Sequence, residues 1–587
     1  MRVNQFFFTL FLLLLNVSVF SQSKDVKLPV NWFNLDLVKN GVFGISTERA
    51  YMELLHDKKP KQRVIVAVID GGIDIDHEDL KDVLWINKNE IPGNGIDDDG
   101  NGYIDDVHGW NFIGSKRGNL AYDNLELVRI YRNYAPKYSS TIKSTVLDSI
   151  QKKEFELYTK ATADFGRKYD DADRTFRIVF SINKVLESIV FINKKAVPTL
   201  QEIDAYKAED EVEEQVKKVI KSGIKESGGV AKFYKEIKDA YKQYDVMLRY
   251  NLNPKYDQRS ELVGDDYSNP NDNYYGNNDV KGPNAEHGSH VSGIIGANRS
   301  NALGINGVAD YISLMGIRVV PEGDERDKDV ANGIRYAVDN GARIINMSFG
   351  KGYKWDKKIV DVAVKYAESK GVLLVHASGN DNLNVDKEDN YPNKYYDSPE
   401  FREYMAKVEK SAKKQASFRP LNGRISNQRT DRTHERYNGN NAVDSIKSGL
   451  PQATNWIEVG ASAYKNNSDL KASFSNYGKY SVDVFAPGFM INSTVPESLY
   501  EEFDGTSMAA PVVSGLAALI LSYYPDFTAK EIREIILSSV SKVVQKVKLI
   551  NDKGQSVRVP FSDLCVSGGV VNAYEALKLA EIYSKKR

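Results

Sequence analysis

Cysteine is almost absent from this sequence. Cys565 is the single cysteine among 587 residues. One cysteine excludes an intramolecular disulfide and a zinc site built from several cysteines. We therefore expect Cys565 to be a small, buried apolar side chain rather than a reactive thiol.

An excess of either charge is also missing. Lys plus Arg total 79 and Asp plus Glu total 80, which gives a formal net charge of −1 at pH 7. Without a basic excess, nucleic acid is not expected as the main ligand. Hydrophobic residues make up 41% of the chain and aromatic residues 11%. The chain can therefore bury a core and is not disordered throughout.

Long apolar runs are confined to the beginning of the chain. Arg2 precedes an apolar segment at Phe6–Val17, and residues 19–21 have a spacing that suits cleavage before Gln22. This pattern predicts a signal peptide over residues 1–21, because about 15 apolar residues are short for a stable membrane span. An uncleaved anchor is the alternative. We expect an exported protein, periplasmic or extracellular, with no membrane span after cleavage.

Short apolar runs rich in β-branched residues alternate with helical patterns along much of the chain. Asp327–Asn340 and Asp356–Lys370 each carry an apolar stripe and end just before a glycine, as helices do. The expected strands are Val64–Ile69, Ile312–Ile317, Arg343–Met347, Val372–Val375, Trp456–Val459 and Val482–Phe485. This alternation predicts an α/β fold with a central, mostly parallel sheet between helices. Such sheets carry their chemistry at the carboxyl ends of the strands.

Two charged stretches interrupt the alternation. Residues 117–262 are rich in Lys, Glu, Asp and Tyr, and residues 392–447 are charged without a clear period. Helical periodicity marks three segments of the first stretch: Thr145–Tyr158, Thr175–Ile192 and Glu211–Leu248. We expect two insertions, the first largely helical. They are either solvated decoration or a cap that limits access to a site.

One domain over residues 63–580 is expected to contain both insertions. Without them it has roughly 300 residues, the size of a large α/β domain. Residues 22–62 lead into this domain, and residues 581–587 form a tail.

Three reactive side chains stand at element boundaries. Asp70 ends an apolar strand, where a lone carboxylate is costly and needs a hydrogen-bond donor. His287 precedes small residues that open a helix, and Ser507 begins a small-residue helix whose first N–H groups are unpaired. Individually each has an ordinary structural interpretation. The chain order Asp, His, Ser is the order used by subtilisin.

The chain resembles the subtilisin-like serine proteases, or subtilases, in these three segments and in further ones. GVLLVHASGN places Asn380 at the family's oxyanion-hole position, and INMSFG resembles the substrate-binding strand. SGGVVNAYEAL resembles the usual end of the catalytic domain. The resemblance implies a subtilisin-like three-layer fold and a serine endopeptidase that acts on proteins or peptides without a catalytic cofactor.

The resemblance also implies roles for single residues. Ser507 would be the nucleophile, His287 the general base, Asp70 the residue that orients and stabilises the imidazolium, and Asn380 the oxyanion donor. The substrate-binding residues would be Ser348, Phe349, Gly350, Ser378 and Gly379. Phe349 suggests a medium or large apolar side chain before the cut bond.

In other possible functions, the same residues catalyse a different reaction or do not act in catalysis. The main alternative is a catalytically silent binding or scaffolding protein on a protease fold, with the helical insertion as its partner surface. An esterase or a peptide ligase would differ only in the acceptor. A metal site at His287 and His290 is disfavoured, because the spacing is not that of a zinc-protease helix.

An acidic loop follows the first strand. Oxygen ligands alternate with glycines in GIDDDGNGYIDD, and the spacing suits a structural calcium ion. The candidate ligands are Asp97, Asp99, Asn101, the Tyr103 carbonyl and Asp105. A solvated Asn-Gly turn is the alternative.

Overall fold

The computed structural model describes residues 28–141, 146–404, 406–407, 449–551 and 554–587. The predicted signal peptide and most of the predicted second insertion lie outside the described residues. The chain divides into two compact units. One contains Tyr122–Asp257, and the other contains Pro29–Ala121 and Gln258–Arg587.

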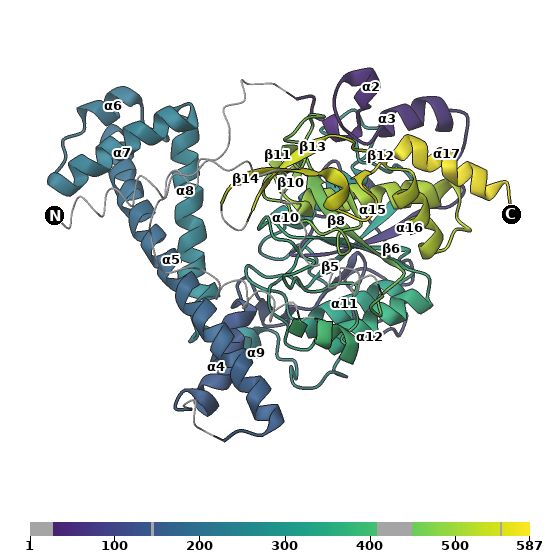
Figure 1. Ribbon diagram of the computed structural model, residues 1–587, viewed down its shortest axis with the longest axis horizontal. Coiled ribbons are helices and arrows are strands. Elements are labelled where there is room, and N and C mark those ends of the chain that lie inside the picture. Colours follow the sequence, from purple (N-terminus) through teal and green to yellow (C-terminus); the bar gives the residue numbers. More distant parts are fainter. Residues whose placement is uncertain (1–27, 142–145, 405, 408–448, 552–553) are drawn as a thin grey trace, which may run out of the picture. The chain divides into compact units, whose positions relative to one another are not determined.

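A sheet of nine strands forms the centre of the larger unit (Figure 1). Its order is β12-β15-β9-β8-β7-β6-β1-β5-β2, and its pairs are parallel except β12 with β15. The strands are β1 Val64–Asp70, β2 Gly109–Asn111, β5 Ile312–Arg318, β6 Ile344–Met347, β7 Leu373–Ala377, β8 Trp456–Ser462, β9 Val484–Pro487, β12 Ser541–Lys542 and β15 Gly569–Val570. The predicted α/β architecture with a mostly parallel sheet is confirmed.

Helices pack on both faces of this sheet. On one face α10 and α15 pack together and contact β1, and α16 and α17 continue that layer. On the other face α11 and α12 pack together, with α11 on β1 and β5 and α12 on β7. Their bounds are α10 Glu286–Gly296, α11 Asp327–Asp339, α12 Lys357–Ser369, α15 Thr506–Tyr523, α16 Ala529–Ser538 and α17 Ala573–Ser584. The larger unit is thus built in three layers.

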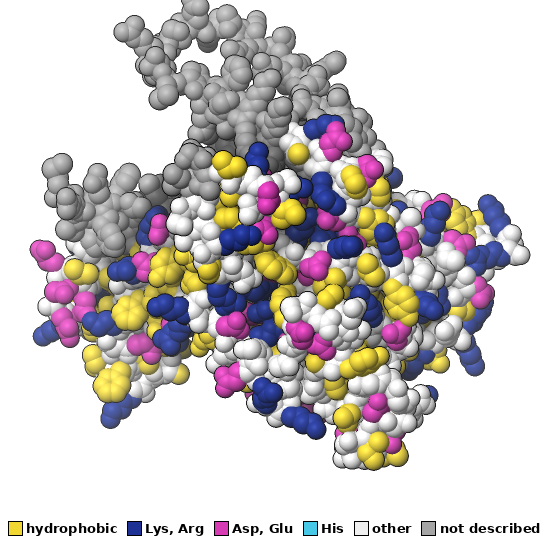
Figure 2. Space-filling view, turned by 90° about the horizontal axis from the view of Figure 1, so that it is seen from below, with side chains coloured by type: hydrophobic (Ala, Val, Ile, Leu, Met, Phe, Trp, Pro, Cys, Tyr) yellow, Lys and Arg dark blue, Asp and Glu magenta, His cyan; other side chains and the backbone are white. Residues whose placement is uncertain are grey.

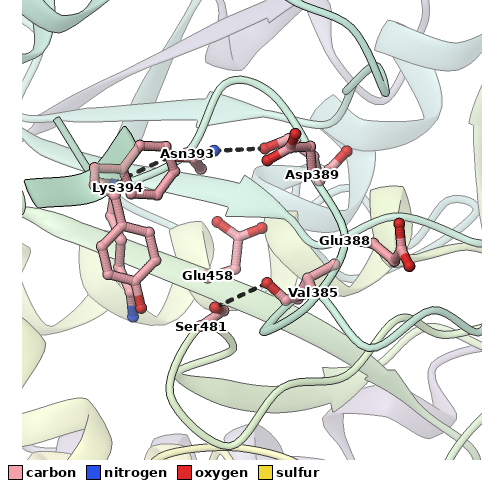
Figure 3. A pocket seen from close by; sticks show the side chains of 10 residues that line it. Val385, Glu388, Asp389, Asn393, Lys394, Glu458 and Ser481 are labelled. Atoms are coloured by element: carbon pink, nitrogen blue, oxygen red, sulfur yellow. Dashed lines mark hydrogen bonds between the residues drawn. The ribbon is translucent and has the colours of Figure 1, made fainter. Parts of the chain in front are cut away.

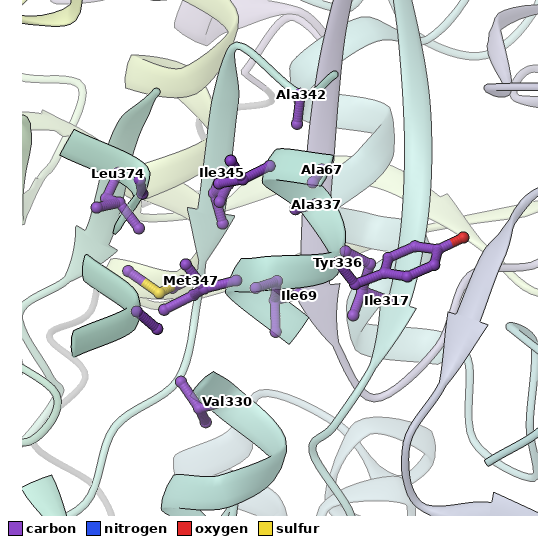
Figure 4. Close-up of a cluster of buried hydrophobic side chains, with 14 of the residues drawn as sticks. Ala67, Ile69, Ile317, Val330, Tyr336, Ala337, Ala342, Ile345, Met347 and Leu374 are labelled. Atoms are coloured by element: carbon purple, nitrogen blue, oxygen red, sulfur yellow. The ribbon is translucent and has the colours of Figure 1, made fainter. Parts of the chain in front are cut away.

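A core cluster lies between the sheet and the α11–α12 layer (Figure 4). Alternate residues of β1 point to this face, so Ala67 and Ile69 join the cluster with Ile317 from β5 and Met347 from β6. Tyr336 contributes from α11 and is 1% exposed. Burial of both sheet faces explains why the strands are continuously apolar rather than alternating.

Helix α15 needs separate mention because of its composition. It is the helix among the described residues that is long and apolar enough to cross a membrane, with a mean hydropathy of 1.5. However, 94% of it is buried inside the protein. It is therefore the central core helix of the α10–α15 layer.

Short elements complete the larger unit. Two antiparallel hairpins, β10 Ile491–Val495 with β11 Leu499–Phe503 and β13 Lys546–Ile550 with β14 Ser556–Pro560, were not predicted from the sequence. The remaining elements are η1 Trp32–Asn34, α2 Leu37–Asn40, α3 Thr47–Ala50, η2 Tyr51–Leu55, η3 Lys81–Val83, β3 Gly114–Ser115, β4 Gly118–Asn119, α9 Arg259–Leu262 and η5 Phe561–Asp563. Charges of both signs are interspersed on the face that Figure 2 shows.

The smaller unit is helical, which agrees with the prediction of a largely helical first insertion. Its elements are α4 Glu126–Tyr138, α5 Ser149–Asn193, α6 Leu200–Ala205, α7 Glu211–Ser227, α8 Val230–Val246 and η4 Met247–Asn251. Buried side chains of α5, α6, α7 and α8 form a separate core. The two helical segments predicted at Thr145–Tyr158 and Thr175–Ile192 belong to one helix of 45 residues, α5. The segment predicted at Glu211–Leu248 is broken, because Gly228 adopts a left-handed conformation with φ of 82° and ends α7.

Candidate active site

Asp70 is the last residue of β1, at the carboxyl end of the sheet. The strand is apolar and buried, and Asp70 itself is only 2% exposed. Its Oδ1 accepts hydrogen bonds from the Gly71 N–H at 2.7 Å and from His287 Nδ1 at 2.8 Å. His287 Nδ1 also lies 3.0 Å from Oδ2. The buried Asp70 carboxylate therefore has two hydrogen-bond donors, an imidazole and a backbone amide.

The first turn of α10 presents His287 to this carboxylate. A Cβ atom placed on Gly288 would lie 2.1 Å from the Gly72 carbonyl oxygen and 3.2 Å from the Asp70 Cβ. Only a glycine allows α10 to approach the end of β1 so closely. Gly72 has a φ of 147°, and a Cβ there would lie 2.1 Å from the Lys281 carbonyl oxygen. The two glycines thus position the Asp70–His287 pair.

Two opposing effects set the pKa of His287. Desolvation lowers it, whereas the charge of Asp70 and its hydrogen bond raise it, and the net shift is upward from 6.5. The side chain is 43% exposed, and the two interactions with Asp70 together outweigh desolvation. With Nδ1–H donating to Asp70, Nε2 is the ring nitrogen available to take up a proton.

Ser507 lies in the first turn of α15. Its hydroxyl donates to the Ser348 carbonyl oxygen at 3.1 Å, and the Ser348 hydroxyl donates to the Ser507 carbonyl oxygen at 2.9 Å. No hydrogen bond between Ser507 and His287 is present within the part of the chain that the structure describes. The relative positions of Ser507 and His287 follow instead from the pairing of strands in the sheet.

The register between β1 and β6 sets these relative positions. Ile69 pairs with Met347 in parallel register, so the next residues, Asp70 and Ser348, stand side by side at the ends of adjacent strands. Adjacent strands are about 4.8 Å apart. The Ser507 hydroxyl, held at Ser348, therefore lies one strand away from the Asp70–His287 pair.

Asn380 follows β7, the next strand beyond β6. Its Oδ1 accepts hydrogen bonds from the Thr506 N–H and from the Thr506 hydroxyl, both at 2.9 Å. The Thr506 hydroxyl in turn accepts the Gly379 N–H at 3.1 Å. Thr506 thus occupies the amide oxygen of Asn380. The Asn380 Nδ2 group is left to donate to another acceptor, and it lies beside Ser507, the residue that follows Thr506. Sequence reasoning missed Thr506, although its position next to Ser507 was a usable signal.

The predicted substrate-binding residues continue two adjacent parallel strands. Ser348, Phe349 and Gly350 follow β6, and Ser378 and Gly379 follow β7. Asn476 fixes the second segment, since its Nδ2 donates to the Ser378 carbonyl oxygen at 2.8 Å. A Cβ on Gly379, whose φ is 101°, would lie 2.4 Å from that nitrogen. The structure thus brings both segments together beside Ser507.

Comparison with known proteins gives the family. The model of the subtilase family matches residues 61–559, well over half of the chain. The chain belongs to the subtilase family. The resemblance expected from its motifs is confirmed.

Individual relatives have low sequence identity to this subtilase. Subtilisin NAT of Bacillus subtilis subsp. natto and subtilisin E of Bacillus subtilis (strain 168) are each 30% identical over 260 residues, 44% of this chain and 51% of theirs. The chain thus spans about half the length of these two relatives. A solved structure described as proteases from Pseudoalteromonas arctica PAMC 21717 is 23% identical with a TM-score of 0.35, covering 52% of this chain and 78% of that one.

The second histidine of α10 has a packing role in this subtilase. His290 is fully buried, its Nε2 lies 3.0 Å from the Glu501 carbonyl oxygen, and its ring stacks on Phe503 at 4.3 Å. Burial lowers its pKa to about 3, so the ring is neutral. These contacts give no support to a metal site at His287 and His290.

The acidic loop arranges its carboxylates differently from the sequence prediction. Asp97 accepts the N–H groups of Asn101 and Gly102, and Asp105 accepts those of Asn94 and Gly95, so both shape the backbone.

Three carboxylates of this region converge instead: Glu90, Asp99 and Asp106 each place one oxygen within 4.8 Å of the others. Of these, only Asp99 belongs to the predicted ligand set. Three convergent carboxylate oxygens are the ligand type that calcium prefers, so the donor chemistry fits that ion.

Asp70→Asn tests the cause of the His287 pKa shift. The amide keeps an acceptor oxygen but removes the charge, so the pKa of His287 should fall, as measured by NMR titration of the imidazole. A pKa raised in the folded state stabilises the fold fully below about pH 6.5 and loses this effect as the pH rises through the raised value. The stability gap between wild type and variant should therefore shrink with increasing pH.

The matched control is Asp469→Asn at an exposed carboxylate, which should leave the titration unchanged. An unaltered pKa of His287 in Asp70→Asn would show that Asp70 does not cause the shift.

Proposed function

We propose that this subtilase is an exported serine endopeptidase that cleaves peptide bonds through an acyl-enzyme on Ser507. The observation that carries the proposal is the hydrogen bond from His287 to the buried Asp70, one strand away from Ser507 and beside the oriented amide of Asn380. Family membership supports the same chemistry. Export is proposed on the apolar N-terminal segment of the sequence.

Proton transfer begins the mechanism. A serine hydroxyl is a weak nucleophile near neutral pH and needs a base within reach. Ser507 turns its hydroxyl from the Ser348 carbonyl toward His287 Nε2, which takes the proton as the oxygen attacks the peptide carbonyl. The same imidazolium then protonates the leaving amine, and water releases the acyl group by the reverse sequence. Asp70 stabilises the imidazolium that forms. Activity therefore requires a pH above the raised pKa of His287.

Negative charge develops on the carbonyl oxygen as the tetrahedral intermediate forms. Asn380 Nδ2 and the Ser507 N–H at the start of α15 are the proposed donors. Thr506 fixes the amide before the substrate arrives, which removes the cost of orienting it during the reaction. Extended substrate is proposed to lie along Ser348–Gly350 and Ser378–Gly379.

Covalent labelling distinguishes this enzyme from a silent scaffolding protein on the same fold. A fluorophosphonate reporter should label the wild-type chain, and Ser507→Ala should abolish both labelling and peptide cleavage. The control Ser514→Ala changes another serine of α15 and should keep the label, although Ser514 donates to Asn346 in the core. A folded wild-type chain that takes no label would favour the scaffolding function.

Asn380→Ala measures the proposed oxyanion contribution. Turnover should fall about 10²–10³-fold, the loss seen in subtilisin when one such donor is removed. The KM should change little, because the interaction strengthens only as charge develops. Steady-state kinetics on a peptide substrate supplies both values, and a near-normal turnover would remove Asn380 from the mechanism.

We also propose a structural calcium ion at Glu90, Asp99 and Asp106. Binding to the folded state alone would stabilise it by mass action. Millimolar calcium should raise the melting temperature by several degrees, and Glu90→Gln should remove most of that increase. Glu403→Gln, at an exposed carboxylate, is the control. Equal melting temperatures with calcium and with a chelator would contradict the site.

A further inference from the structure

Apolar side chains are exposed where α5 ends, in the smaller unit. Phe191 and Ile192, in the last turn of the helix, are 84% and 64% exposed. Val197 and Leu200 follow in the connection to α6 and at its first residue, and both are also exposed. The chain reverses between the two pairs at Lys194, which adopts a left-handed conformation with φ of 52°. The four apolar side chains thus belong to one reversal of the chain, here called the α5 tip.

The core of the smaller unit does not account for the α5 tip. That core takes other residues of α5, including Leu186 and Ile189, which are buried. Single exposed apolar side chains are ordinary on a protein surface. A phenyl ring beside an isoleucine in water, by contrast, forgoes a large part of the free energy of burial, and grouped exposure of this kind marks an interaction surface.

Positive charge accompanies the α5 tip. Residues 188–201 contain Lys194 and Lys195 but no Asp or Glu. Lys195 Nζ pairs with Glu202 Oε1 at 2.7 Å, whereas Lys194 forms no ion pair among the described residues. A lysine at the end of a helix interacts favourably with the helix dipole, but this role requires no exposed apolar neighbours. The surface therefore combines apolar side chains with a free positive charge.

The surface of a lipid bilayer matches both properties. There, apolar side chains enter the boundary between headgroups and acyl chains, and lysines are attracted to anionic lipids. The exposed apolar area of the α5 tip is on the order of 400 Å², whereas a specific protein interface buries about 800 Å² on each partner. By itself the α5 tip is therefore small for a stable protein complex.

A second copy of the chain is a less suitable partner. An inserted phenyl ring would need an apolar pocket on the other copy. The hollow of about 370 Å³ that Figure 3 shows in the larger unit has three carboxylates among its lining residues, those of Glu388, Asp389 and Glu458. A phenyl ring in this hollow would remove water from the carboxylates and offer them no hydrogen bond, which is costly.

We propose that the α5 tip docks this subtilase onto anionic lipid bilayers, with Phe191 and Ile192 in the headgroup boundary and Lys194 beside the lipid phosphates. The docking is peripheral, because only side chains enter the surface and no helix crosses it. It is independent of the proposed endopeptidase function, since the α5 tip belongs to the helical unit and the candidate active site to the larger one. The helical insertion thereby has a role in membrane contact.

Co-sedimentation with lipid vesicles tests the docking. The chain from Gln22 onward is used, because the apolar segment Phe6–Val17 would itself bind lipid. This chain should bind vesicles of mixed phosphatidylcholine and phosphatidylglycerol. The double variant Phe191→Ser/Ile192→Ser should lower the partition coefficient at least about tenfold, because it removes the inserted apolar area.

Two matched controls separate the α5 tip from exposed side chains in general. The double variant Val38→Ser/Met52→Ser removes exposed apolar side chains of the larger unit and should leave vesicle binding unchanged. Lys194→Glu should weaken binding to the anionic vesicles about fivefold or more, because each lysine near such a surface contributes to attraction. Lys358→Glu, at an exposed lysine of α12, should not weaken it.

A fluorescent label reports insertion directly. Cys565 is buried, and burial raises the pKa of its thiol to about 11, so it should resist labelling. Val197→Cys places a reactive thiol in the α5 tip and leaves Phe191 and Ile192 in place. An environment-sensitive fluorophore at this position should shift its emission to the blue when anionic vesicles are added. The same fluorophore on Val38→Cys should show no shift.

The docking is overturned if the wild-type chain does not sediment with anionic vesicles, or if Phe191→Ser/Ile192→Ser binds them as well as wild type. Self-association that requires Phe191 and Ile192, seen by analytical ultracentrifugation in place of lipid binding, would assign the surface to a second copy and overturn it too. Peptide cleavage in solution is measured in parallel. Its absence in a chain that binds vesicles would contradict the endopeptidase function and leave the docking standing.

Discussion

The parallel pairing of β1 with β6 is the constraint on which the candidate site depends. The register that joins Ile69 to Met347 places Asp70 next to Ser348, and the hydroxyl of Ser507 is held at Ser348. A shift of one residue would turn the side chains of β1 to the opposite face of the sheet. Buried apolar residues on both faces of β1 therefore fix the geometry of the candidate site as well as the fold.

A second requirement is close approach between backbone segments. Helix α10 can bring His287 to Asp70 only because Gly288 lies against the Gly72 carbonyl oxygen without a side chain. Gly72 makes the same kind of room for the Lys281 carbonyl oxygen. Packing in the interior is dense, so an added methyl group at these points has nowhere to go. Small residues near the site are therefore part of its positioning, although they carry no chemistry.

The helical unit has the means to fold on its own contacts. Side chains from α5, α6, α7 and α8 form its core, with Leu186 and Ile220 fully buried. Asp148 and Gln151 form a capping box at the start of α5, and Gly228 ends α7. An insertion that has a hydrophobic core of its own places few demands on the domain whose sequence it interrupts. This property accounts for a long charged insertion within an otherwise continuous α/β pattern.

Sequence pattern predicted six of the nine strands of the sheet, and helices α11 and α12, with bounds within about three residues, because buried runs and glycine stops are local signals. It did not predict the short strands β2, β12 and β15. It failed for α5, where a polar stretch hides helical continuity, and for α4, which contains Pro136 in its last turns. In the acidic loop the sequence did not indicate that Glu90, Asp99 and Asp106 lie close together, because convergence of carboxylates depends on how the loop folds back.

The sequence by itself determined the family and the α/β class and indicated the proposed reactive side chains, since each motif consists of consecutive residues. Only the tertiary structure decided that Asp70 holds His287 and that Thr506 orients Asn380. These relations join residues that are far apart in the chain. Their distances follow from strand register and from the contact of helices with the sheet, which no local pattern records.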